Sequence, residues 1–142
     1  MFRNDGSLAI LDFGIAKHID SVDRTGHGEI LGTPRYMSPE QVRGAALDRR
    51  TDIYSAGVLL FQMLSGTHLF DGETAAEVAL HHLNTQPPDL PGHLVQYQRL
   101  MDKLVEKDRE ARFRNADEVI GFLSRKYYQG TGAYRAETTV KL

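Results

Sequence analysis

The sequence predicts a mainly α-helical fold with a small β-hairpin at its N-terminal end. Two observations support this fold class. Short apolar segments flank a turn signal at residues 4–6, and apolar residues recur at helical spacing through the second half of the chain. With 142 residues, 41% of them hydrophobic, the chain is long enough for one domain with a modest core.

The composition argues against several classes of protein. The absence of Cys removes disulfides and thiolate metal sites, and it fits our expectation of a cytoplasmic location. A net charge of −2 provides no electrostatic footprint for nucleic acid. The longest apolar run, at residues 56–64, is too short to span a bilayer, and residues 1–6 lack the apolar part of a signal peptide. We therefore expect neither a nucleic-acid partner nor a membrane segment.

The N-terminal part predicts a hairpin followed by a long loop. Asn-Asp-Gly at residues 4–6 separates the short segments 1–3 and 8–11, which is typical of a β-hairpin. Residues 18–29 are polar, contain Gly and show no period, so they predict a loop. Loops of this length are usually functional or mobile.

A short helix and a long apolar helix are predicted next. Ser38 can cap the short helix, and Gln41 can complete a capping box with it. The long helix covers residues 52–65, with Thr51 as its cap and Gly66 as its stop. Almost every face of this helix is apolar, so it must be buried on all sides.

Three further helices are predicted at residues 74–83, 94–106 and 116–127, followed by a flexible tail at 128–142. Asn115 can cap the last helix. The apolar stripe expected on the last helix consists of Ala116, Val119, Ile120 and Leu123. No linker divides residues 1–127, so we treat them as one unit.

Several motifs occur in a specific order. Residues 12–14 read Asp-Phe-Gly after an apolar segment, and residues 32–41 read Gly-Thr-Pro-Arg-Tyr-Met-Ser-Pro-Glu-Gln. Asp52 opens the apolar helix, and residues 107–112 read Lys-Asp-Arg-Glu-Ala-Arg. Together these motifs resemble the Ser/Thr protein kinases, most closely their bacterial, eukaryotic-like branch. The resemblance implies a partial kinase C-terminal lobe that starts at the strand before Asp-Phe-Gly.

The resemblance implies a cofactor site at Asp12, Phe13 and Gly14. Asp12 matches the carboxylate that holds Mg²⁺ for ATP, because Mg²⁺ prefers hard oxygen ligands. Phe13 matches the residue that packs to set the position of this Asp, and Gly14 supplies backbone freedom. Taken alone, an Asp turn after a strand is a common structural feature.

Residues 12–40 resemble an activation segment. In the family, a phosphate there orders the segment by pairing with Arg. Thr25 is the first candidate acceptor and Ser21 the second, although both can be ordinary loop hydroxyls. Thr33 matches the residue that contacts the catalytic Asp at the substrate-binding end of the segment, which favours Ser or Thr over Tyr as the acceptor.

The resemblance also implies structural anchors. Glu40 matches the Glu of the Ala-Pro-Glu signature and would form a buried ion pair with Arg112, since a lone buried carboxylate is costly. Asp52 matches the residue that anchors the catalytic loop, although a carboxylate at a helix N-terminus is also favourable by itself. None of the six His shows metal-ligand spacing, and His81 and His82 are expected on a helix surface.

Other parts of the kinase signature do not occur in the sequence: the Gly-rich phosphate loop, the strand Lys, its partner Glu, and the catalytic His-Arg-Asp loop with its Asn. We therefore expect the intact parent to transfer a phosphoryl group from ATP to protein Ser or Thr. The chain alone should be inactive, with weak or no binding of Mg²⁺ and ATP.

Two other functions remain open. The chain can be a non-catalytic, pseudokinase-like binding or scaffold module, or one half of a split kinase. Its expected partners are a protein substrate or the missing kinase half. Because the helix 52–65 would lack a packing neighbour, we also expect self-association through exposed apolar surface.

Overall fold

The computed structural model describes residues 34–127. The predicted hairpin, the first part of the predicted activation segment and the predicted tail lie outside this range. So do these predicted site residues: Asp12, Phe13, Gly14, Ser21, Thr25 and Thr33. The described residues form helices, turns and loops without a β-strand, which confirms the mainly helical prediction for this part of the chain.

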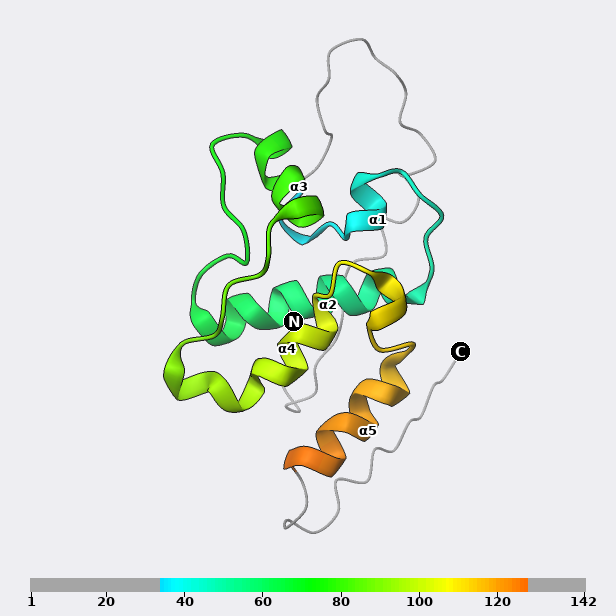
Figure 1. Cartoon of the computed structure of the whole chain (residues 1–142), viewed down its shortest axis with the longest axis vertical. Helices are drawn as coiled ribbons and strands as arrows, with labels where there is room; N and C mark the ends of the chain where they lie inside the picture. The colour runs from blue at the N-terminus through cyan, green and yellow to red at the C-terminus, as the bar shows by residue number, and fades with distance from the viewer. Residues whose placement is uncertain (1–33, 128–142) are drawn as a thin grey trace, which may run out of the picture.

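The helices surround a central one. In chain order the elements are η2 (Pro34–Tyr36), α1 (Pro39–Val42), α2 (Arg49–Ser65), α3 (Ala75–Asn84), η3 (Gly92–Tyr97), α4 (Gln98–Leu104), η4 (Arg109–Ala111) and α5 (Ala116–Tyr127). Figure 1 shows α2 across the middle of the molecule, with α1 and α3 on one side and α4 and α5 on the other. None of the helices among residues 34–127 is long and apolar enough to cross a membrane.

The central helix α2 begins earlier than predicted. Asp48 caps it by accepting a hydrogen bond from the backbone N–H of Arg50 at 2.8 Å, so Thr51 is not the cap. Thr51 lies in the first turn, where its hydroxyl donates to Glu40 instead. The predicted stop is confirmed: Gly66 adopts a left-handed conformation with φ of 76°, which Gly reaches without strain.

The core forms around one face of α2. Its buried members from α2 are Ile53, Tyr54, Val58 and Phe61, and those from other elements are Leu69, Phe70, Leu90, Leu100, Met101, Leu104, Val105 and Phe113. Gly57 lies where α2 and α4 meet. A Cβ atom there would stand 2.6 Å from the Cβ of Leu104, so these helices approach at a distance that only Gly permits.

The opposite face of α2 is open. Leu59 is 49% exposed and Met63 is 69% exposed, and Asp52 and Ala56 lie exposed on the same face at helical spacing. We call these four residues the α2 stripe. The prediction that this helix is buried on all sides is therefore wrong for this face, and apolar surface is exposed at Leu59 and Met63.

The shorter helices follow the sequence signals closely at most ends. The predicted helix 74–83 corresponds to α3, which is shifted by one residue because Thr74 is its N-cap. The predicted helix 94–106 is wrong in its first half. The 3-10 turn η3 follows Pro91 there, and the α-helix begins only at Gln98, whose side chain accepts a hydrogen bond from the N–H of Leu90.

The last helix, α5, has the predicted bounds and cap but a different buried face. Asn115 accepts a hydrogen bond from the N–H of Glu118 at 2.9 Å, as the cap prediction requires. Val119 and Leu123 pack against the core as predicted, and Phe122 joins them. Ile120 is 52% exposed and Ala116 is also exposed, because the ring of Phe122 packs edge-on against Phe113 and turns that side inward.

Candidate functional site

The candidate site is built on α1, a helix of four residues. The hydroxyl of Ser38 accepts from the N–H of Gln41 at 3.3 Å, and the side chain of Gln41 accepts from the N–H of Ser38 at 2.8 Å. These reciprocal bonds are the predicted capping box, and Pro39 occupies the first helical position. The short helix thereby fixes Glu40, whose carboxylate is buried.

Glu40 meets Arg112, which comes from a segment 72 positions later in the chain. The guanidinium donates through Nη1 and Nη2 to the two carboxylate oxygens at 2.8 and 2.9 Å, a bidentate pair with both residues 5% exposed or less. Thr51 donates a third hydrogen bond to this carboxylate at 3.0 Å. The structure thus brings these two residues together as the resemblance implied, and it adds Thr51.

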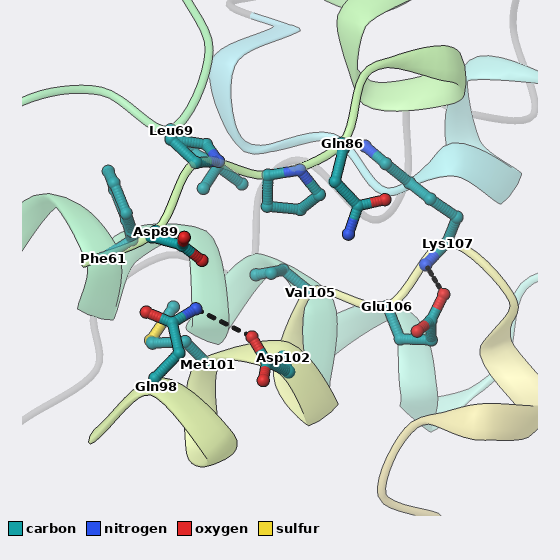
Figure 2. A pocket seen from close by; sticks show the side chains of 12 residues that line it. Phe61, Leu69, Gln86, Asp89, Gln98, Met101, Asp102, Val105, Glu106 and Lys107 are labelled. Atoms are coloured by element: carbon teal, nitrogen blue, oxygen red, sulfur yellow. Dashed lines mark hydrogen bonds between the residues drawn. The ribbon is translucent and has the colours of Figure 1, made fainter. Parts of the chain in front are cut away.

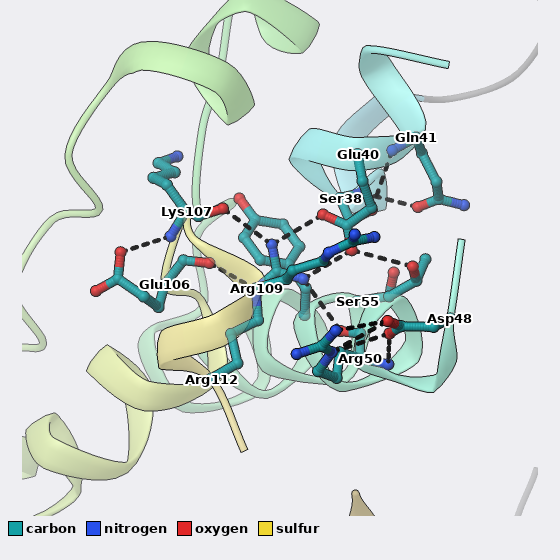
Figure 3. Close-up of polar contacts among 12 residues, drawn as sticks. Ser38, Glu40, Gln41, Asp48, Arg50, Ser55, Glu106, Lys107, Arg109 and Arg112 are labelled. Carbon is teal, nitrogen blue, oxygen red and sulfur yellow. Dashed lines mark hydrogen bonds and ion pairs between the residues drawn. The ribbon is translucent and has the colours of Figure 1, made fainter. Parts of the chain in front are cut away.

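Arg112 also contacts three backbone carbonyl groups in two segments of the chain. Its guanidinium donates to the carbonyl oxygens of Glu106 at 2.6 Å, Arg50 at 3.1 Å and Lys107 at 3.2 Å. It lies over the ring of Tyr54, 4.8 Å from the ring centre. We call Glu40, Thr51, Tyr54 and Arg112 the Arg112 centre; Figure 3 shows how α1, α2 and the segment around residues 106–112 converge on it.

The electrostatics of the Arg112 centre favour the ionised carboxylate. Burial raises the pKa of Glu40, but the hydrogen bonds from Arg112 and Thr51 and the positive charge of Arg112 together outweigh burial and leave this pKa below its ordinary value. No buried side-chain nitrogen or oxygen among residues 34–127 lacks a hydrogen-bond partner. The centre is therefore a satisfied buried network.

An exposed layer of charges covers one side of this centre. Arg50 pairs with Asp48 at 2.8 Å and with Glu110 at 2.7 Å, and Arg109 donates to the carbonyl oxygen of Ala46 at 2.8 Å. These contacts join the loop before α2 to η4. Because they are partly solvated, they add little stability compared with the buried pair.

A second polar chain leads from the centre to η2. The hydroxyl of Tyr54 lies 2.9 Å from Nδ1 of His82, and Nε2 of His82 lies 3.1 Å from the carbonyl oxygen of Arg35. Tyr54 and His82 are both 0% exposed. Burial, followed by the positive charge of Lys107, lowers the pKa of His82 to about 4, so the ring is neutral at neutral pH.

The prediction that His81 and His82 lie on a helix surface is therefore wrong for His82. His81 is partly exposed and contacts the side chain of Thr85. His82 falls at helical spacing from Val78 and Ala79, which are also buried. That spacing was the available signal, and the polarity of His concealed it.

The remaining predicted anchor, Asp52, lies on the α2 stripe. Its carboxylate is exposed at the first turn of α2, and no hydrogen bond or ion pair to it occurs within residues 34–127. Its role in anchoring a catalytic loop stays a prediction.

One pocket of the described part lies away from these residues. It has a volume of about 340 Å³ between residues 86–89 and α4. Figure 2 shows Phe61, Met101 and Val105 within it and Asp102 at its edge, where Gln98 donates to that carboxylate. Glu40, Asp52 and Arg112 do not line this pocket.

The Arg112 centre has a structural role and does not take part in a reaction. Every polar group of the ion pair is engaged, and both side chains are buried, so neither can contact a substrate. The pair instead holds the segment that follows residue 33 against the segment 106–112. A structural anchor of this kind can set the position of a neighbouring functional segment without taking part in a reaction.

Comparisons with known proteins identify the family of the chain. The protein kinase domain family matches residues 1–121. The serine/threonine-protein kinase drp72 of Corynebacterium efficiens is 40% identical over 116 residues, which cover 81% of this chain and 22% of the relative. The serine/threonine-protein kinase PrkC of Bacillus subtilis is 35% identical over 118 residues, which cover 80% of this chain and 18% of the relative.

A third relative, the serine/threonine-protein kinase pkn3 of Myxococcus xanthus, is 48% identical over 91 residues. These residues cover 61% of this chain and 17% of pkn3. The chain thus spans about a fifth of the length of the curated relatives it matches. The match over residues 1–121 shows that this chain belongs to the protein kinase domain family.

Proposed function

We propose that the chain is the C-terminal-lobe part of a Ser/Thr protein kinase whose intact form transfers the γ-phosphoryl group of ATP to protein Ser or Thr. The observation that carries this proposal is the buried bidentate pair of Glu40 and Arg112. It joins the Ser-Pro-Glu motif to the segment 107–112, two of the motifs on which the kinase resemblance rests.

The proposal assigns roles along residues 12–40. Asp12 is the carboxylate for Mg²⁺, with Phe13 and Gly14 setting its position, and the ion neutralises phosphate charge when bound. Thr25 and then Ser21 are the candidate phosphorylation sites. Thr33 belongs to the substrate-binding end, which directly precedes the described turn η2.

By this proposal the chain alone does not catalyse phosphoryl transfer. Its sequence contains no Gly-rich phosphate loop and no His-Arg-Asp motif, so the base and the phosphate clamp must come from elsewhere. Asp12 alone binds Mg²⁺ and ATP weakly or not at all. The protein substrate and a cytoplasmic location belong to the same proposal.

The α2 stripe favours one alternative. Leu59 and Met63 leave apolar surface open on the helix that carries the core, as expected for half of a split kinase whose other half covers this face. In that case the partner is the missing kinase half. Self-association through the same face is the competing outcome.

A chimaeric kinase tests the proposal. Residues 1–121 would replace the matching segment of PrkC, and phosphate transfer from radiolabelled ATP to a protein substrate would be measured. We expect activity in the chimaera, its loss in Asp12→Ala, and little change in Asp117→Ala, a substitution at an exposed position of α5. The unmodified chain alone should incorporate no label.

Two results would contradict the proposal in different ways. A folded chimaera without activity would favour a non-catalytic binding or scaffold module. Robust self-phosphorylation by the pure chain, absent in Asp12→Ala, would show that the chain is a complete catalyst.

A further inference from the structure

His82 occupies an unusual position for an imidazole among residues 34–127. It lies on α3 with 0% exposure, between the hydroxyl of Tyr54 on α2 and the carbonyl oxygen of Arg35 in η2. Its ring packs edge to face with Phe70, with 5.0 Å between ring centres and 87° between planes. Three separate elements are therefore joined through one side chain.

The partners fix the tautomer of His82. A backbone carbonyl oxygen can only accept, so Nε2 carries the proton and donates to Arg35. Nδ1 then holds a lone pair and accepts from the hydroxyl of Tyr54. Burial raises the pKa of Tyr54, which keeps that hydroxyl protonated and able to donate.

The surroundings of His82 keep it neutral. Lys107 donates from Nζ to the carbonyl oxygens of His81 and His82 at 3.1 and 2.9 Å, and its ammonium lies 4.3 Å from the centre of the Phe70 ring. The charged groups near Lys107 include Glu106, whose negative charge acts to raise the pKa of Lys107, and Arg112, which pairs with Glu40 beneath Tyr54. A protonated His82 would therefore face the positive charge of Lys107, which disfavours its protonation.

The hydrogen bond from His82 to Arg35 is made to the middle residue of η2, whereas the hydrogen bonds from Met37 and Ser55 are made at the ends of this turn. The turn closes on itself through the N–H of Met37, which donates to the carbonyl oxygen of Pro34 at 3.1 Å. At its far end, Ser55 donates to the carbonyl oxygen of Tyr36 at 2.8 Å. Among residues 34–127, His82 supplies the side-chain contact to the carbonyl of Arg35, in the middle of the turn.

We propose that His82 is a positioning residue for the substrate-binding end of the activation segment. Its neutral ring fixes η2 against the Arg112 centre through Tyr54, and η2 directly follows Thr33. This inference rests on the proposed function, because it takes the segment before η2 as substrate-facing. It adds a residue to which the kinase motifs assign no role.

Nuclear magnetic resonance of the full chain tests the geometry without any need for activity. Long-range proton–nitrogen correlations should show His82 as the neutral Nε2–H tautomer at pH 6. Hydrogen exchange of the Met37 amide then reports the order of η2, and exchange of α2 amides reports global opening.

Two substitutions separate positioning from bulk packing. His82→Gln can place an amide N–H near the position of Nε2, whereas His82→Asn can replace only the acceptor at Nδ1. We expect His82→Asn to speed exchange of the Met37 amide about tenfold relative to the α2 amides, the usual scale for one lost hydrogen bond. His82→Gln should restore most of the protection, and His81→Asn serves as the matched control next to it.

The inference is overturned if His82 carries its proton on Nδ1, or if His82→Asn leaves Met37 exchange unchanged relative to α2. Equal effects of His82→Gln and His82→Asn would overturn it as well, since a packing role alone would not distinguish them. In the PrkC chimaera, His82→Asn should raise the KM for protein substrate more than it lowers kcat. An inactive parent chimaera would count against the proposed function only, because the exchange experiment is read on the chain itself.

Discussion

The two faces of α2 differ in burial: one packs against other elements of the fold, and the other is exposed. One face carries Thr51 and Tyr54 to the Arg112 centre and brings Gly57 against α4, and no buried side-chain nitrogen or oxygen of the described part is left unpaired. The other face presents Leu59 and Met63 to the outside. When a helix is apolar on nearly every face, hydrophobicity does not show which face is buried. In α2 the buried face is marked instead by Thr51 and Tyr54, which make polar contacts, and by Gly57, which permits close packing.

The largest effect should come from breaking the buried pair. Arg112→Met leaves the Glu40 carboxylate buried without its partner, so the free energy of unfolding should fall by about 3–5 kcal/mol. Urea unfolding followed by circular dichroism measures this change. Arg109→Met removes a partly exposed arginine from the same segment and should have little effect. An equal fall in the free energy of unfolding in both variants would contradict the expectation that the buried pair contributes more than the exposed contacts.

Acid should weaken the buried face next. The pKa of His82 lies at about 4 in the folded chain against 6.5 as its ordinary value, so the unfolded chain binds more protons between these values. Stability from this group is complete above pH 6.5 and is lost as the pH falls toward 4, by up to about 3 kcal/mol. The lowered pKa of Glu40 extends the loss to lower pH.

Urea unfolding at pH 7, 6, 5 and 4.5 checks this slope. His82→Gln should flatten it, and His93→Gln, at an exposed position, should leave it unchanged. The groups that face His82 are Lys107 and His81, with the pair of Glu40 and Arg112 behind Tyr54. A persisting loss of stability with falling pH in His82→Gln would assign the acid sensitivity to the carboxylates with lowered pKa, which are Glu40, Asp48, Glu110 and Glu118.

A smaller loss is expected where α2 meets α4. Gly57→Ala places a methyl group 2.6 Å from the Cβ of Leu104, and the helices must separate to accept it. Overpacking of this kind costs about 1–3 kcal/mol, partly offset by about 1 kcal/mol of better helix propensity. Thermal unfolding should show a lower Tm than for Gly121→Ala in α5, where the nearest atom is the end of the Arg125 side chain at 3.5 Å. A rise in Tm would show that these helices are loosely packed.

The smallest effect on folding, and the clearest on association, should occur on the α2 stripe. Met63→Glu changes an exposed residue, so the free energy of unfolding should stay within about 0.5 kcal/mol. If Leu59 and Met63 promote self-association, sedimentation should show less of it in Met63→Glu. Glu77→Gln, at an exposed position of α3, is the control. A chain that is monodisperse and monomeric without any substitution would contradict the expected self-association.

The sequence predicted those parts of the fold that depend on local hydrogen bonding. Ser38, Gly66 and Asn115 mark helix ends because their side chain or backbone acts on residues one turn away. The start of α2 was misplaced because Asp48 and Thr51 are both good caps, and only Glu40, distant in the chain, takes Thr51 out of that role. Such tertiary competition is not visible in a local window.

The candidate site could be predicted only in part, because some of its contacts join residues that are distant in the chain. Glu40 and Arg112 were found through the motif resemblance, and burial then required that they pair. His82 was missed because a polar residue on a helix suggests solvent unless its partners are known, and both of its partners come from other elements. Ile120 was predicted to face the core, but Phe122 does so instead, because neighbouring apolar residues on α5 fit the helical pattern almost equally well.

The 72 positions between Glu40 and Arg112 have a consequence for the order of folding. Closing so long a loop costs chain entropy before any contact can repay it, whereas the helices between the two residues form from local contacts. We therefore expect the ion pair to form late, after the intervening helices have docked. Loss of the pair should accelerate unfolding more than it slows refolding. The pair therefore acts chiefly by prolonging the lifetime of the folded chain.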